Sequence, residues 1–270
     1  MNSTFGNPFQ QPPNNQPSQN TSNAPFRVID SAQGATASFE ILEYAPLQAG
    51  QYYFQQRAGG RLKQVRIVMN NGKVIMEAGA LQFLKGHIQS QNDVGGVSGL
   101  MGKLAGSMLN NESAFKPSYV GTGEIYLEPS FEHYLVYHLQ NEEIIVDKGM
   151  FFACEATVEV GTAMQKSISS ALKGGEGLFQ TKLSGTGIAI MKSPVPANEI
   201  MKLQLNNERV QVDGNFALLR TGGISFTVER SAKSLLGSAT SGEGYLQTFS
   251  GTGTLWIAPT EPIYFPAPTV

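Results

Sequence analysis

Hydrophobic and polar residues alternate along much of the chain from Ser38 onward, the pattern expected of strands in an antiparallel sheet. In residues 131–139, for example, Leu135 and Tyr137 fall on one face, whereas Glu132 and His138 fall on the other. One face of such a strand is mostly apolar and the other is mixed. We therefore predict an all-β fold whose sheets bury one face.

The clearest local signal in this pattern is a pair of apolar runs, residues 65–69 and 74–76, on either side of Asn71-Gly72. Asn-Gly between two such runs is the strongest short-range signal of a β-hairpin, because both residues tolerate a positive φ. We predict a hairpin there. The corresponding positions further along the chain are Asn141-Glu142 and Asn207-Glu208, for which we predict turns of a longer type.

Three motifs recur in one order at intervals of about 65 residues, which indicates an internal threefold repeat. The first is an asparagine followed by an apolar alternation and an acid, and these acids are Glu77, Asp147 and Asp213. The second centres on Glu112, Glu176 and Glu243. The third is a Gly-Thr-Gly triplet that leads into an apolar strand, with glycines Gly121, Gly123, Gly185, Gly187, Gly251 and Gly253. We predict β-sandwich-like repeats over 38–130, 131–193 and 194–260 that form one globular domain, 38–260.

The repeated glycines and acids are interpreted as structural turn or bulge residues rather than as a catalytic site. Each occurs at an equivalent point of its repeat, and an acid beside glycine commonly binds loop amides. Glycine at a bulge also allows neighbouring backbone to approach closely. The alternative, paired carboxylate catalysis by the repeated acids, would make the protein a hydrolase.

Between the strands of each repeat lies a segment with helical spacing of apolar residues, within 97–108, 164–172 and 235–236. We predict short helices that cover the open end of each β unit. An amphipathic helix that docks on a membrane or partner, with Lys103 on its polar side, is the alternative.

Composition and charge narrow the functional classes. Residues 1–26 carry no charged side chain and are rich in Asn, Gln, Pro and Ser, so we predict a disordered tail there and a short extension at 261–270. The net charge is −2, which argues against a nucleic-acid partner. The chain shows no secretory leader and no apolar run of the roughly 18 residues needed to cross a bilayer, so we expect a cytoplasmic location.

Few residues suggest reaction chemistry. Cys154 is the sole cysteine and lies in an apolar stretch, 150–160, that reads as a buried strand, so we expect a packing role. The three histidines are His87, His133 and His138, and the last two point to opposite faces of one predicted strand. The aromatic residues Tyr126 and Trp256 follow their triplets at equivalent core positions. We predict no catalytic residue, no metal site and no cofactor.

The repeat motifs resemble those of the altered inheritance of mitochondria 24 family. The resemblance rests on residues 139–142, 146–149, 175–179 and 185–191 and extends over about residues 38–258. It implies a fold like that of the tryptophan RNA-binding attenuation protein, with three β units around a pseudo-threefold axis. It implies no established enzyme activity, and the mitochondrial members are associated with inner-membrane organisation.

Together these observations favour a non-enzymatic binding or scaffold protein. We expect a homo-oligomer whose further partner is a protein or a membrane surface, and no nucleic-acid partner. The two alternatives are a nucleic-acid-binding regulator, which the attenuation-protein-like fold suggests, and the hydrolase described above.

Overall fold

The computed structural model describes residues 25–45, 61–91, 116–164, 179–230 and 245–261. Within these ranges the chain consists of β-strands and one short 3-10 helix, so the all-β prediction is confirmed. In chain order, the elements are β1 (Phe26–Gln33), β2 (Ala37–Tyr44), β3 (Lys63–Met76), β4 (Leu81–Gln91), β5 (Ser118–Leu127), β6 (His133–Val146), β7 (Phe151–Glu155), β8 (Val158–Met164), β9 (Phe179–Ser193), η2 (Ala197–Glu199), β10 (Met201–Val212), β11 (Ala217–Thr221), β12 (Ile224–Arg230) and β13 (Tyr245–Ile257).

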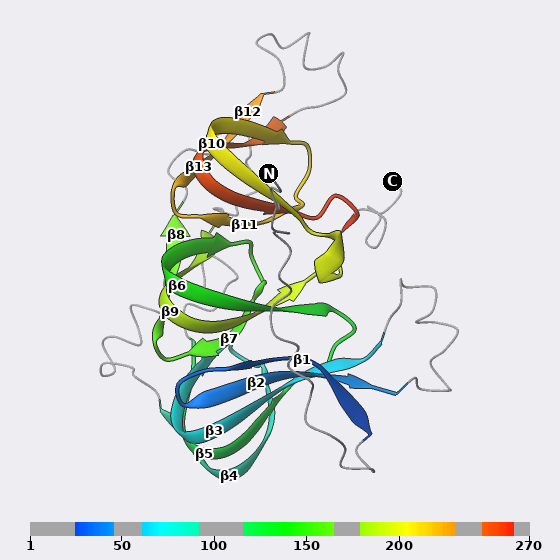
Figure 1. Cartoon of the computed structure of the whole chain (residues 1–270), viewed down its shortest axis with the longest axis vertical. Helices are drawn as coiled ribbons and strands as arrows, with labels where there is room; N and C mark the ends of the chain where they lie inside the picture. The colour runs from blue at the N-terminus through cyan, green and yellow to red at the C-terminus, as the bar shows by residue number, and fades with distance from the viewer. Residues whose placement is uncertain (1–24, 46–60, 92–115, 165–178, 231–244, 262–270) are drawn as a thin grey trace, which may run out of the picture.

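The strands form three units that lie in a row along the longest axis of the molecule (Figure 1). The first unit contains β1–β5, the second β6–β9 and the third β10–β13. Antiparallel pairing of β3 with β7 joins the first unit to the second, and pairing of β6 with β11 joins the second to the third. Among the described strands no pairing joins the first unit to the third. The arrangement around a pseudo-threefold axis is therefore not confirmed.

Each unit has one long strand pair, and each pair bends at a β-bulge. In the second unit Asn141 has a φ of 53°, and the register of β6 against β9 shifts at this point. Asn71 and Asn207 occupy the same position in β3 and β10, with φ of 48° and 56°. Opposite each asparagine, the hydroxyl of the triplet threonine accepts a hydrogen bond from the asparagine N–H, at 2.8, 3.0 and 3.0 Å. The bulge is thus held from both strands.

The predicted hairpin at Asn71-Gly72 is wrong, and so are the turns predicted at Asn141-Glu142 and Asn207-Glu208. Strand β3 runs through Asn71 without reversing and is 14 residues long. The positive φ that asparagine tolerates is used to bend the strand at a bulge instead of to turn the chain. A dipeptide pattern alone does not distinguish these two uses.

The β-structure begins earlier in the chain than the sequence predicted, and most of the predicted helical segments lie outside the described residues. Strand β1 begins at Phe26 and pairs with β2, so the β-structure starts before residue 38. The segments predicted as short helices lie outside the described residues, except that Met164 ends strand β8. No helix in the part of the chain that the structure describes is long and apolar enough to cross a membrane.

The hydrophobic core consists of three clusters that share strands. All five residues of β7 are buried, because its two faces enter different clusters. Phe152 and Ala153 pack with the first unit, whereas Phe151 and Cys154 pack with the second. Strand β11 does the same further along, where Leu219 packs with the second unit and Ala217 with the third. Neighbouring units are therefore joined by shared packing as well as by backbone hydrogen bonds.

Candidate functional site

The glycines of the triplets all have positive φ, between 114° and 151°. In the second unit a Cβ added to Gly187 would lie 2.5 Å from Thr157 Oγ1 and 3.1 Å from Glu155 Oε2. The missing side chain thus allows the turn between β7 and β8 to cross directly over the bulge. The acids Glu112, Glu176 and Glu243, predicted as structural turn residues, lie outside the described residues.

The repeated acids Glu77, Asp147 and Asp213 each follow the long strand that carries the bulge asparagine of their unit, which is β3, β6 or β10. Glu77 forms an ion pair with Lys116, with Oε2 2.5 Å from Nζ. Asp147 accepts a hydrogen bond from Gln180 Nε2 at 3.4 Å, and burial raises the pKa of its carboxyl. Asp213 is exposed. The hydrogen bonds and ion pairs of the described residues join none of the three acids to another, so they do not form a carboxylate pair.

A polar contact that the sequence did not indicate lies where the second and third units meet. The buried Arg220 of β11 donates from Nη1 to Gln180 Oε1 at 2.7 Å, and Gln180 in turn contacts Asp147. Burial lowers the pKa of Arg220 to about 10, although the Asp147 charge opposes this shift. This series of contacts from Arg220 through Gln180 to Asp147 connects β11 to the edge of the second unit.

The junction between the first and second units has its own buried acid, Glu155 at the end of β7. Its Oε1 accepts a hydrogen bond from the Ala35 N–H at 2.8 Å, and its Oε2 accepts one from the Ile188 N–H at 3.0 Å. Ala35 lies in the turn between β1 and β2, and Ile188 lies in β9. Both oxygens of one carboxylate therefore bind the backbones of two units, which satisfies a charge that is only 5% exposed.

Beside this junction lies an open depression with a volume of about 750 Å³. The β1–β2 turn, the bulge of β3, the middle of β4 and the β7–β8 turn surround it. Its lining combines apolar and polar groups, and the polar ones include Thr36, Lys73, His87, Glu155 and Thr157. A depression of this size has room for a small polar molecule or part of a partner chain.

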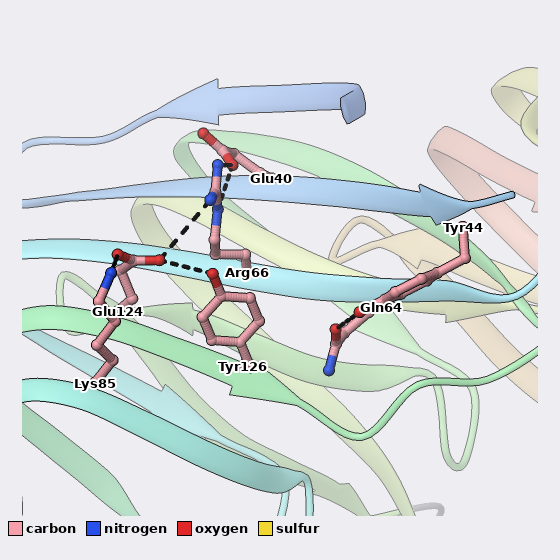
Figure 2. Close-up of polar contacts among 7 residues, drawn as sticks. All are labelled: Glu40, Tyr44, Gln64, Arg66, Lys85, Glu124 and Tyr126. Carbon is pink, nitrogen blue, oxygen red and sulfur yellow. Dashed lines mark hydrogen bonds and ion pairs between the residues drawn. The ribbon is translucent and has the colours of Figure 1, made fainter. Parts of the chain in front are cut away.

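A ladder of alternating charges crosses the first unit from β2 to β4 (Figure 2). Glu40 pairs with Arg66, Arg66 Nη1 lies 3.8 Å from Glu124, and Lys85 Nζ lies 2.8 Å from the other oxygen of Glu124. Tyr126 donates its hydroxyl to Glu124 at 2.7 Å. The hydrogen bond from Lys85, followed by that from Tyr126, lowers the pKa of Glu124. The charges compensate one another, so this ladder stabilises cross-strand pairs.

Nearby in Figure 2, Gln64 is almost fully buried and accepts a hydrogen bond from the Tyr44 hydroxyl. Its amide nitrogen donates to Gln82 and to the Leu127 carbonyl. This side chain therefore joins β2, β3, β4 and the end of β5. Its polar atoms serve the sheet, since buried amides are stable only when they are hydrogen-bonded.

The residues weighed for reaction chemistry are not activated for it. Cys154 is fully buried, and burial raises the pKa of its thiol, which disfavours the reactive thiolate. His133 is half-buried, and burial together with Lys63 lowers its pKa to about 4, so its imidazole is neutral at physiological pH. Across the described ranges, no group of three or more His, Cys, Asp or Glu side chains is placed to hold a metal ion.

The fold and these contacts define a class of protein: an all-β chain built as a row of bulged antiparallel units joined by buried polar contacts. The family model described as "Mitochondrial biogenesis AIM24" matches residues 54–260, so the chain belongs to the AIM24 family. The resemblance drawn from the repeat motifs is confirmed.

A solved X-ray structure of a Streptococcus pyogenes protein is similar in fold. The two sequences are 19% identical, the TM-score is 0.54, and the match covers 81% of this chain and 92% of the other. At this identity the similarity extends to the fold alone. None of the curated proteins matches the chain.

Proposed function

We propose that this chain is a non-enzymatic binding or scaffold protein that acts as an oligomer. The observation that carries the proposal is that its acidic side chains are engaged in structural contacts, either within one unit or between two units. Both oxygens of Glu155 bind backbone amides, Glu77 is paired with Lys116, and Glu124 is paired with Lys85. Side chains used in this way stabilise a rigid platform and are poor acids, bases or nucleophiles.

Within the same proposal, the three units are copies of one β unit. What supports this is that each long strand pair has its bulge, its positive-φ asparagine and its threonine hydrogen bond at the same point. A chain of equivalent units suits a scaffold, because each unit presents the same kind of surface along the row.

The depression between the first and second units is the proposed contact site for a partner. It is bounded by backbone from both units, so its shape depends on the junction that Glu155 holds. His87 adds an imidazole to the same lining as the Glu155 carboxylate. This chemistry suits a polar or acidic group on a protein or membrane surface, which are the partner classes expected from the sequence.

The test is native mass spectrometry of the protein purified at low salt from its own cells. An oligomer, or a chain that retains a bound molecule, is the expected result. A retained molecule should be lost from His87→Ala and kept by the matched variant His138→Ala, since His138 is exposed on β6. A bare monomer would contradict the proposal, and a turnover assigned to the purified chain would contradict its non-enzymatic part.

A further inference from the structure

Two neighbouring apolar side chains of β4, Phe83 and Leu84, are exposed, at 47% and 37%. Strand β4 follows the turn after β3, just as β7 follows the turn after β6 and β11 follows the turn after β10. Each of these strands pairs in the same register with the strand of its unit that carries the Gly-Thr-Gly triplet. Phe83 lies opposite Tyr126, as Ala153 lies opposite Ile190 and Leu219 opposite Trp256. Yet Ala153 and Leu219, which correspond to Phe83, are at most 2% exposed.

The difference lies in what covers the outer edge of the strand. Residues 153–155 of β7 pair with residues 74–76 of β3, and residues 219–221 of β11 pair with residues 144–146 of β6. Each pairing is extended at both ends by one further backbone hydrogen bond, and these bonds occupy equivalent positions in the two junctions. Glu77 N–H donates to the Phe152 carbonyl, and Asp147 N–H to that of Leu218. Ala156 N–H donates to the Lys73 carbonyl, and Gly222 N–H to that of Glu143.

A third junction of this kind is not made within the described residues. By the repeat, residues 83–85 of β4 correspond to one side of it, and residues 210–212 of β10 correspond to the other. Strand β4 pairs with β5 and β10 pairs with β13, and each has no described partner on its other edge. The two strands lie at opposite ends of the row, so one chain does not bring them together (Figure 1).

We propose that β4 of one copy pairs with β10 of a second copy, in the register of the two internal junctions. Phe83 then lies opposite Val212, Leu84 opposite Gln211, and Lys85 opposite Val210. Asp213 N–H donates to the Gln82 carbonyl, and Gly86 N–H donates to that of Arg209. The proposal rests on the proposed oligomeric function and specifies its interface.

A second copy is the occupant that fits both edges, because the chain already contains this junction twice with its own strands. The contact is head-to-tail, so a pair of copies retains one open β4 edge and one open β10 edge, and the sheet can continue from copy to copy. Gln211 stands where the internal junctions have Ile75 and Ile145, so less apolar surface is buried. Polar residues on an edge strand weaken edge pairing. We therefore expect a weak association that is populated only at high protein concentration.

Sedimentation velocity of the full chain over a concentration series tests this interface with two variants. Leu84→Lys places a charge in the β4 edge. Gln211→Pro removes the N–H that β10 directs to its open edge, while the bonds of the neighbouring residues to β13 remain. We expect the wild type to self-associate and each variant alone to sediment as a monomer. Both changes lie at edges, so unchanged circular dichroism and melting temperature verify that the variants fold.

Mixing the two variants is the decisive step. Leu84→Lys retains an intact β10 edge and Gln211→Pro an intact β4 edge, so the mixture forms a complex of twice the 29.1 kDa chain mass and no larger species. Ile29→Lys, at a 41% exposed apolar residue of β1, is the matched control and should associate like the wild type.

Three results would overturn the inference. If both variants associate like the wild type, another surface mediates assembly, and the proposed function stands without this interface. If the mixture stays monomeric while the wild type associates, the two edges are not partners. A wild type that is monomeric at every concentration overturns the head-to-tail contact, whether the edges are open or covered by another segment of the chain. A retained molecule on that monomer would still support binding.

Discussion

At the scale of single residues, the chain depends on positions where backbone approaches backbone. Gly187 has a φ of 151° and lies beneath Thr157 and Glu155. Replacement of Gly187 by alanine should lower the free energy of unfolding by about 2–4 kcal/mol, since it adds both backbone strain and a steric overlap. Gly161→Ala is the matched control, because its nearest neighbour is Lys182 at 3.7 Å, and its effect should stay within about 0.5 kcal/mol. Equal losses in urea unfolding would contradict this account.

His133 gives a second residue-scale prediction, which concerns pH. Its pKa of about 4 in the folded chain lies below the unfolded value of about 6.5, so the unfolded chain binds the proton first. The stability contributed by neutral His133 is present above about pH 6.5 and is lost as the pH falls towards 4. Compared with His133→Gln, the wild type should lose about 1–2 kcal/mol more over this window, because solvent screens part of the shift at a half-buried side chain. Parallel pH profiles of unfolding for the two proteins would show that the imidazole is not held neutral.

At the scale of elements, β7 and β11 hold the units together, and Glu155 anchors β7. Glu155→Gln places an amide NH₂ against one of two backbone N–H donors and should destabilise the fold by about 2–4 kcal/mol. Glu159→Gln on the exposed side of β8 is the control and should have little effect. Hydrogen exchange should show faster exchange at Ala35 and Ile188 in the first variant alone. Unchanged exchange at both amides would contradict the role of the carboxylate.

Some features of these elements could be predicted from the sequence, whereas others depend on contacts between distant strands. The single buried strand predicted over 150–160 is correct for β7, but an exposed turn at 156–157 separates β7 from β8, and the two faces of β7 are buried in different units. A strand buried on both faces has no alternation to indicate its partner. The Asn-Gly signal was misleading because bulges and hairpins use the same positive φ. Glu155, Gln180 and Arg220 carry no motif, and only long-range pairing brings them together.

At the scale of the whole molecule, the recurring glycine and asparagine motifs were readable from the sequence, and in the structure these residues have positive φ at the bend of each unit. The family resemblance followed from these same motifs and is confirmed by the match over residues 54–260. How the units are arranged was not readable. That arrangement depends on pairing between strands far apart in sequence, such as β3 with β7, and the repeat pattern is compatible with a ring or a row.

We propose that this row of β units is a platform that assembles with copies of itself. Sedimentation equilibrium of the full-length chain across a wide concentration range tests that claim most directly. Head-to-tail assembly should give a weight-average mass that rises with concentration from 29.1 kDa without levelling off at a dimer, since the contact leaves open edges. A mass that stays at 29.1 kDa throughout would contradict it.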